Sequence, residues 1–399
     1  MQFYNCPAFN GKDYKILSFL NGFTPIMSHI TYPSNQGKLY FFNFSPWRMI
    51  QIEPFFYAPN NQKFICKDLD DALNRGLDSK SNIFIYGIKK FPKLQEYAKK
   101  HNITIYRIED AFIRSVALGS GFARPYSLGI DSRGVYFDPS KVSDLEYLLQ
   151  NYQFNSNLIS RAKKVREMIL NSKFSKYNYL EHVNLNIDRE KYSKVILVTG
   201  QVEDDMSIKY GAFGLNNSDL LEIVKEKNRD AYIIYKPHPD VLSGNRIGKV
   251  SNETIKKCTN RVVTNISIDS AIEACDEVHT LTSGAGFDAL LRNKSVFTYG
   301  MPFYAGWGLT TDYRECKRRT RRVSLDELVA VALILYPRYI SPKTNKFCEV
   351  EQTLKELKEE QDYYFNHKLY RYMVNLKGYI LPRGRRFIRT MLKPLKVSI

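Results

Sequence analysis

The sequence predicts an α/β protein with two Rossmann-like domains. The chain has 399 residues, more than the ~100–200 residues of one ordinary domain. Hydrophobic residues make up 44% and charged residues 25%, which is typical of a globular protein and excludes a disordered or fibrous chain. Short apolar runs alternate with stretches long enough for helices in two parts of the chain. This alternation predicts parallel sheets covered on both faces.

The first part begins with a β-α-β pattern over residues 82–110, where two apolar runs flank a stretch with helical spacing. The segment 126–137 is predicted to be a hairpin, because a DSRG turn interrupts its apolar residues. Ser143 is followed by acidic residues and predicts a capped helix start.

The second part follows an amphipathic helix that is predicted from about 157 to 179. Helices are expected again from Leu325 onward. The predicted strands between them are 195–198, 232–235, 262–263, 277–280 and 296–299. The predicted organisation is a first domain (1–155), a connecting helix (156–190), a second domain (191–335) and carboxyl-terminal helices with a basic tail (336–399).

Positive charge is concentrated in two places. The net charge is +18, and nine cations follow the last acidic side chain, Asp362. A second basic block lies at 317–322. Such blocks suit an anionic partner, whether nucleic acid, an acidic membrane surface or an acidic glycan, and charge alone does not choose among them.

The chain is expected to be cytoplasmic. Its six cysteines are scattered singly, which indicates reduced thiols. The longest apolar run, 328–336, is too short to cross a bilayer, and the first residues do not resemble a secretory signal. The tail from about 367 to 399 is predicted to dock on a membrane or a partner, since apolar residues stand among its cations. Packing of these helices on the first domain is an alternative of equal weight.

Acidic residues directly follow the predicted strand at 195–198. The segment TGQVEDD (199–205) contains Gly200, Gln201, Glu203 and Asp205. Carboxylates so close together must stay hydrated, pair with cations or hold raised pKa values. They therefore indicate either a catalytic site or a solvated acidic loop at a helix start.

The motif YKPHPD (235–240) follows the next strand. Its two prolines stiffen the backbone around His238 and hold the imidazole in one direction. Together with Lys236, His238 would suit a phosphate. A structural histidine in a stiff turn is the alternative.

A strand, a turn of small residues and an apolar helix occur in LTSGAGFDALL (281–291). Unpaired amides and the Ser283 hydroxyl would face the strand end, where an anion can bind. The spacing matches neither a dinucleotide fingerprint nor a P-loop, so a nucleotide phosphate without either motif is predicted, with a plain helix cap as the alternative.

The segment YGMPFYAGWGLTTD (299–312) contains Tyr304 and Trp307 among glycines. Aromatic side chains in such a loop can close over a sugar or a base. They can equally form core packing, and composition does not decide between the two.

These segments together resemble the bacterial capsule polysaccharide β-Kdo glycosyltransferases, where Kdo is 3-deoxy-manno-octulosonic acid. The motifs GQVEDD, YKPHPD, LTSGAGFDALL, YGMPFYAGWGLTTD and SLDELVAVALILYPRY occur in family order, and IEDAFIRS and GIDSRGVYFD match the amino-terminal half. The resemblance runs from about Ile83 to Tyr339 and is greatest to the carboxyl-terminal module of two-module capsule-linker enzymes. Asp288 stands where a glutamate is expected, and Ala285 where the family varies.

The resemblance implies a GT-B-like fold and transfer of Kdo, with retention, from CMP-β-Kdo to a glycan or glycolipid acceptor. The expected location is cytoplasmic, and peripheral at the inner membrane if the basic tail docks there. CMP would bind to the second domain, and the acceptor would enter from the first. This chain has one module where the linker enzymes have two, so a processive or dual-linkage role does not follow.

The catalytic roles come from the resemblance. Asp205, at the end of the GQVE-x-D motif, is expected to be the nucleophile of a double displacement. Glu203 would orient it or remain solvated, and Glu109 or Asp110 would deprotonate the acceptor.

The donor carries one phosphate, which Lys236, a protonated His238 and the turn from Ser283 to Gly286 could neutralise without a metal. Arg114 or Lys209 could meet the Kdo carboxylate, although a structural salt bridge is an equal alternative for Arg114. No cofactor and no metal site are expected. The other residues assigned to the donor or substrate are Gly200, Gln201, Gly284, Asp288, Tyr304 and Trp307.

Other classes of protein compete with this interpretation. A nucleic-acid binder would explain the charge but not the acidic loop beside a rigid His-Pro turn, and no nucleic-acid module is present. A non-catalytic assembly subunit that binds CMP is a second alternative. A transferase for another CMP-activated ulosonic acid, such as a sialic acid, is the nearest competitor among enzymes.

Overall fold

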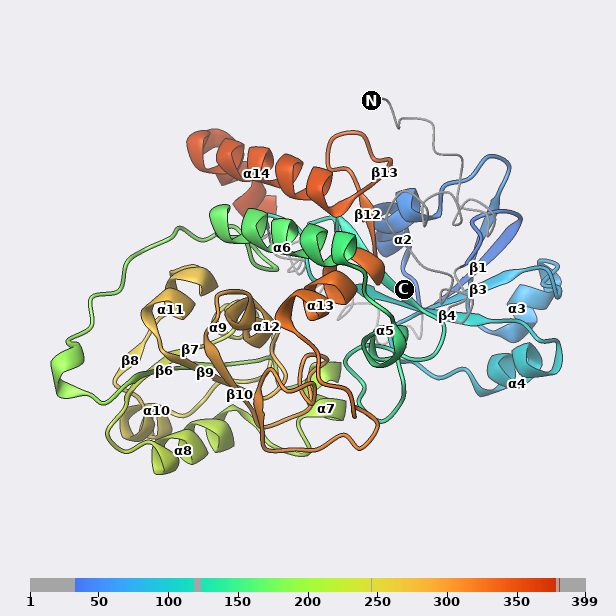
Figure 1. Ribbon diagram of the computed structural model, residues 1–399. Helices are drawn as coiled ribbons and strands as arrows, with labels where there is room; N and C mark the ends of the chain where they lie inside the picture. The colour runs from blue at the N-terminus through green and yellow to red at the C-terminus, as the bar shows by residue number, and fades with distance from the viewer. Residues whose placement is uncertain (1–32, 118–122, 245, 378–379, 381–399) are drawn as a thin grey trace, which may run out of the picture. The chain divides into compact units, whose positions relative to one another are not determined.

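The computed structural model describes residues 33–117, 123–244, 246–377 and 380 (Figure 1). The chain divides into two compact units. Unit 1 takes its residues from Met1–Val135, Tyr152–Arg161 and Ala332–Ile399, and unit 2 from Tyr136–Asn151 and Ala162–Val331. Residues 136–151, placed in the first domain on sequence grounds, thus belong to unit 2, and the chain returns to unit 1 at Ala332.

The sheet of unit 1 has seven strands in the order β13-β12-β5-β4-β3-β1-β2. Neighbours among β1 to β4 run parallel, whereas β5 and β12 run antiparallel to their neighbours. The strands are β1 (Lys38–Phe42), β2 (Gln62–Cys66), β3 (Asn82–Tyr86), β4 (Ile105–Asp110), β5 (Ser127–Asp131), β12 (Pro337–Ile340) and β13 (Phe347–Cys348).

The predicted β-α-β unit is confirmed by β3, the helix α4 (Pro92–Lys100) and β4. The hairpin predicted for residues 126–137 is wrong. Only β5 forms from the segment 126–137. Asp131 accepts hydrogen bonds from the amides of Arg133 and Gly134, at 2.9 and 2.8 Å, which makes the expected turn. The chain after the turn does not pair back, because β5 is already bonded to β4 on one side and to β12 on the other.

The region beyond residue 336 is also not purely helical. β12 joins the first sheet and pairs with β5, about two hundred residues earlier in the chain. The helices of unit 1 include α2 (Pro46–Ile52), the 3₁₀ helix η2 (Glu53–Phe56), α3 (Leu69–Asn74), α4 (Pro92–Lys100) and α14 (Val350–Asn366).

The sheet of unit 1 is buried on both faces. Leu39 and Phe41 of β1 pack in one apolar cluster, and Tyr40 and Phe42 pack in another. Successive residues of a strand point to opposite faces. The continuous apolar sequence of β1 therefore reflects a sheet covered on both sides.

The sheet of unit 2 has six strands, all in parallel pairs, in the order β11-β10-β9-β6-β7-β8. All five strands predicted for this region are confirmed, and β11 is added at the edge. The strands are β6 (Val195–Thr199), β7 (Tyr232–Lys236), β8 (Arg261–Val262), β9 (Glu277–Thr280), β10 (Ser295–Thr298) and β11 (Thr311–Asp312).

Unit 2 contains α5 (Asp144–Asn151), which begins directly after Ser143, as the sequence predicts. The Ser143 hydroxyl accepts a hydrogen bond from the Glu146 amide at 3.0 Å. The amphipathic helix α6 (Ser156–Asn171) begins in residues of unit 1 and ends in residues of unit 2. The π-helix η5 (Ala330–Leu335) begins in residues of unit 2 and ends in residues of unit 1. The other helices of unit 2 are η4 (Arg189–Lys191), α7 (Met206–Gly211), α8 (Asn217–Lys227), α9 (Pro239–Leu242), α10 (Asn252–Cys258), α11 (Ile268–Ala274), α12 (Gly284–Leu291) and α13 (Leu325–Val329). Among the described residues, no helix has the length and apolarity needed to span a bilayer.

Three of the five cations in the basic block at 317–322 form ion pairs within unit 2. Arg318 and Arg319 both pair with Glu146, at 2.8 and 3.1 Å, and Arg321 pairs with Glu327 at 3.0 Å. Arg319 is buried and also donates to the carbonyls of Pro302 and Ala305 at 2.7 Å. Two carboxylates serve these three arginines, so the block keeps a net positive charge, and its binding to an anionic partner stays a prediction.

We expect Arg319→Met to lower the free energy of unfolding by about 3 kcal/mol, because Glu146 would lose its buried partner and two carbonyls their donor. Trp307 lies 5.5 Å from the Arg319 guanidinium and is one of two tryptophans. Its fluorescence in a Trp47→Phe background, followed during urea denaturation, measures the loss. Lys317→Met is the matched control, since Lys317 is exposed, and a similar loss there would contradict the assignment.

Candidate active site

Three polar loops meet at one edge of the parallel sheet of unit 2. They follow β6, β7 and β9, which are adjacent in the order β9-β6-β7. The Gly200 amide donates to the Lys236 carbonyl at 2.8 Å, which joins the first two loops. A Cβ on Gly200 would lie 2.6 Å from the Tyr235 hydroxyl, so only glycine allows this approach. Ligands of open α/β sheets bind at this carboxyl edge.

Gln201 joins the first loop to the third. Its side-chain oxygen accepts the Thr282 amide at 2.9 Å, and its side-chain nitrogen donates to the Thr282 hydroxyl at 3.0 Å. The buried Asn217 holds the Gln201 main chain on both sides, accepting from its amide at 2.9 Å and donating to its carbonyl at 2.8 Å. Gln201 is thus a positioning residue whose own side chain is 7% exposed.

The carboxylates of the first loop have different roles. Glu203 accepts the Asn217 amide at 3.0 Å, and Asp204 pairs with Arg246 at 3.0 Å. Asp205 caps α7, with Oδ1 accepting from the Ser207 amide and hydroxyl at 2.9 and 2.8 Å. Among the described residues, no hydrogen bond occupies its other oxygen, Oδ2. Asp205 and Glu203 are both half-buried, so the expected nucleophile is partly accessible.

His238 caps the short helix α9. Its Nδ1 accepts the Asp240 amide at 3.1 Å, which places the proton of the neutral ring on Nε2. Burial lowers the pKa of His238, although the charges of Asp240 and Asp205 act to raise it. The structure thus favours a neutral imidazole over the expected imidazolium.

Lys236 is buried at the end of β7. Its ammonium donates to the Ile266 carbonyl at 2.7 Å, and the residue is 6% exposed. Burial lowers the pKa of Lys236 to about 8. The expected direct contact with a phosphate is therefore not supported, because the side chain is turned into the protein.

The turn before α12 exposes main chain at the end of β9. The Ser283 hydroxyl accepts the Ala285 amide at 3.2 Å, and Gly284 is exposed with open space around it. A Cβ on Gly286 would lie 2.1 Å from the Tyr304 hydroxyl, which donates to the Ser283 carbonyl at 2.5 Å. The absence of a side chain at Gly286 therefore lets the Tyr304 ring pack against the turn and bond to it.

Tyr304 and Trp307 correspond to the core-packing alternative. Both are fully buried, and the Trp307 indole donates to the Phe303 carbonyl at 2.9 Å. Their burial does not support contact with a substrate.

Two further expected residues of unit 2 are accessible. Lys209 is exposed on α7, one turn after Asp205. Asp288 is half-buried on α12, where burial raises the pKa of its carboxyl to about 7 against the opposing charge of Arg292.

The expected residues of unit 1 lie around the end of β4. Arg114 is buried and donates to Asp110 at 2.6 Å, to the Ser115 hydroxyl at 3.1 Å and to the Ala123 carbonyl at 3.0 Å. These bonds match the structural alternative for Arg114. Glu109 is half-buried on the same strand.

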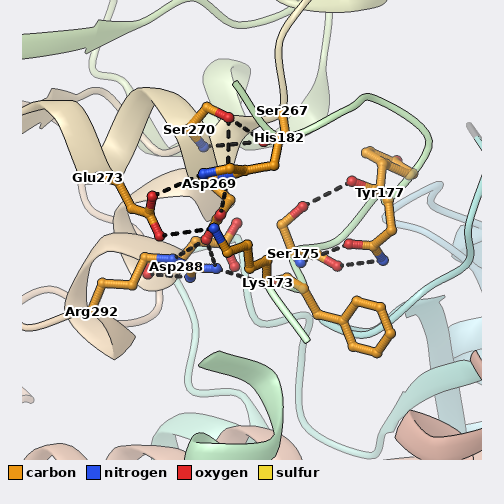
Figure 2. Close-up of polar contacts among 12 residues, drawn as sticks. Lys173, Ser175, Tyr177, His182, Ser267, Asp269, Ser270, Glu273, Asp288 and Arg292 are labelled. Carbon is orange, nitrogen blue, oxygen red and sulfur yellow. Dashed lines mark hydrogen bonds and ion pairs between the residues drawn. The ribbon is translucent and has the colours of Figure 1, made fainter. Parts of the chain in front are cut away.

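A cluster that sequence patterns did not reveal lies beside α11 and α12 (Figure 2). His182 Nδ1 lies 2.9 Å from Asp269, and Nε2 lies 3.1 Å from Glu273. These three residues could in principle hold a metal ion. However, Arg292 already pairs with Asp269 and Lys173 with Glu273, so the carboxylates are neutralised without one. The cluster fastens the segment around His182 to α11.

Asn217 is the other residue that the sequence analysis missed. Its only local signal is the capping motif in which Asn216 and Asp219 start α8. The partners of His182 are 87 or more residues away, beyond the reach of any local pattern.

Comparison with known proteins places the chain in a family. Residues 83–339 match the family described as Capsule polysaccharide biosynthesis protein. The capsule polysaccharide modification protein LipA of Neisseria meningitidis is 42% identical over 79% of this chain and 45% of LipA. The lipopolysaccharide-processing protein LpsZ of Rhizobium meliloti is 40% identical over 69% of this chain and 64% of LpsZ. The chain thus spans about half the length of LipA.

Two solved structures of KpsC from Thermosulfurimonas dismutans share the fold. The β-Kdo 2,7 transferase is 34% identical with a TM-score of 0.65, over 81% of this chain and 99% of that one. The β-Kdo 2,4 transferase is 29% identical with a TM-score of 0.68, over 80% and 97%. The predicted α/β, GT-B-like fold class is confirmed, and the chain belongs to the capsule polysaccharide biosynthesis protein family, which it shares with these β-Kdo transferases.

Proposed function

We propose that this protein is a retaining β-Kdo transferase that moves Kdo from CMP-β-Kdo to a glycan or glycolipid acceptor in capsule or surface polysaccharide synthesis. The observation that carries the proposal is that Asp205 and His238 lie in the loops after the adjacent parallel strands β6 and β7, which the bond from the Gly200 amide to the Lys236 carbonyl joins. One supplies a carboxylate nucleophile and the other a hydrogen-bond donor. The similarity to the KpsC transferases supports this choice of sugar.

The phosphate of CMP would bind between His238 and the amino terminus of α12. The neutral His238 ring offers Nε2–H, and the open turn offers the Gly284 amide, whereas the amides of Thr282, Ser283 and Ala285 already donate within the turn. Preorganised donors of this kind stabilise a leaving phosphate without a bound metal. Asp288, on the next turn of α12, is the candidate for the nucleoside part of CMP.

Retention would follow from two displacements. Asp205 Oδ2 attacks the anomeric carbon, the bond from that carbon to the phosphate oxygen breaks, and CMP leaves with the electron pair. The acceptor hydroxyl then attacks the same carbon and releases the Asp205 carboxylate, while a base takes the hydroxyl proton. Glu109 and Asp110, both at the end of β4, are the candidates for this base, and Asp110 also pairs with Arg114.

The Kdo carboxylate needs a cation near Asp205. Arg114 is buried with its donors engaged by unit 1, whereas Lys209 is exposed on α7. Lys209 is therefore the better candidate for this contact.

The function is tested by supplying several CMP-activated ulosonic acids, each with EDTA and with an acceptor glycan. We expect CMP release from CMP-Kdo to exceed that from CMP-sialic acid, and EDTA to leave it unchanged because no step requires a metal. CMP binding without turnover of any donor would instead indicate an assembly subunit. A strict requirement for Mg²⁺ would show that the phosphate is neutralised in another way.

For the nucleophile, we expect Asp205→Asn to keep CMP binding and to lower transfer by at least about three orders of magnitude, because an amide cannot attack. Asparagine caps helices as well as aspartate, so α7 should remain intact. Intact-protein mass spectrometry of the wild type, with donor but no acceptor, should show a Kdo-sized adduct that the variant lacks. Asp204→Asn is the matched control and should retain transfer. Near wild-type turnover of Asp205→Asn would exclude Asp205.

For His238, we expect His238→Ala to lower kcat by about 10²–10³-fold, the usual effect of losing one preorganised donor. The lowered pKa of His238 keeps the ring neutral near pH 7. The rate should therefore hold steady as the pH rises from about 6.5, the usual histidine value, and fall on acidification. The same sign applies to stability, since the unfolded chain binds the proton more tightly and acid favours unfolding. A kcat/KM that falls as the pH rises above 6.5, and that is flat in His238→Ala, would instead indicate an imidazolium.

A further inference from the structure

A second helix follows α14 (Figure 1) and is anchored to it by one face. Residues 368–377 are helical. The Tyr370 ring lies 5.0 Å from that of Tyr363, and the Tyr364 hydroxyl donates to Asn375 at 2.9 Å. This anchored face partly fulfils the alternative in which the carboxyl-terminal helices pack on the first domain. The remainder of the predicted docking tail, beyond Ile380, lies outside the described residues.

The other face of this helix carries an exposed apolar stripe. The exposed fractions are 71% for Leu369, 63% for Tyr372, 52% for Met373 and 39% for Leu376. These residues follow the spacing i, i+3, i+4 and i+7, which on a helix gives one stripe about 100° wide. A contiguous apolar patch of this kind marks an interaction surface rather than the scattered exposure normal for monomers.

Positive charge borders the stripe. Lys368 and Lys377 are exposed, and at 100° per residue each lies about 40° from one edge of the stripe. No acidic side chain follows Asp362, whereas nine cations do. Unlike the block at 317–322, neither lysine has an ion pair with another described residue. An apolar stripe flanked by lysines and free of acidic groups matches an anionic lipid surface.

We propose that the helix at 368–377 docks the protein on an anionic bilayer. The stripe enters the boundary between headgroups and acyl chains, and Lys368 and Lys377 reach lipid phosphates. Tyr370 and Asn375, on the opposite face, keep the helix attached to α14. The helix thus transmits membrane attachment to unit 1 and requires no catalytic step.

The test is flotation of the full chain with vesicles of phosphatidylcholine, with and without phosphatidylglycerol. We expect binding only with phosphatidylglycerol, and weaker binding at high salt. Leu369→Ser, Met373→Ser and Leu376→Ser combined should lower the partition coefficient at least tenfold. Lys368→Gln and Lys377→Gln should each lower it about fivefold. The matched control combines Ile50→Ser, Tyr57→Ser and Leu73→Ser, exposed apolar residues elsewhere in unit 1, and should bind like the wild type.

Three outcomes would overturn the proposal. The first is equal binding of the wild type to both vesicle types, and the second is a loss of vesicle binding in the control variant equal to that in the stripe variant. The third is a wild-type protein that does not bind vesicles but is a dimer in light scattering, and that the stripe substitutions convert to a monomer. The last would assign the stripe to a second copy. The flotation assay uses no sugar donor, and CMP release from a water-soluble acceptor reaction should persist in the stripe variant. Failure here is therefore distinguishable from failure of the proposed transferase activity.

Discussion

The hydrogen bonds between Gln201 and Thr282 determine how the candidate site is built. Gln201 begins the loop that contains Asp205, and Thr282 begins the turn that precedes α12. Because the Asn217 side chain also fixes the Gln201 main chain, the loop cannot shift without breaking buried hydrogen bonds. The candidate nucleophile and the candidate anion-binding turn, from two adjacent strands, are thereby held in one geometry. The proposed glycosyl transfer would require such preorganisation.

Close main-chain approach is the second constraint on the site. Gly200 lies against Tyr235, and Gly286 lies against Tyr304, with no space for a Cβ at either position. Tyr304 in turn belongs to the loop that Arg319 holds through the Pro302 and Ala305 carbonyls. Arg319 of the basic block therefore supports the loop that contains Tyr304. The Tyr304 and Arg319 side chains are both buried.

Local sequence patterns predicted the second sheet well because its strands are short apolar runs with both faces buried. They failed where pairing is long-range. The strand β5 was expected to pair within a hairpin, but it pairs with β12, whose sequence stands among predicted helices. In the site, the resemblance to a family supplied Asp205 and His238, and their roles stay predictions. The neutral state of His238, the burial of Lys236 and the role of Asn217 depend on packing, which a single sequence does not encode locally.

The burial of Lys236 and His238 also changes how anion binding should be understood. The sequence suggests two cations beside a phosphate, yet desolvation lowers the pKa of both. One ammonium is bonded to a carbonyl, and one imidazole is held neutral by an amide. The site therefore depends on oriented dipoles more than on net charge, and dipoles fixed by the fold need no reorganisation when a phosphate leaves.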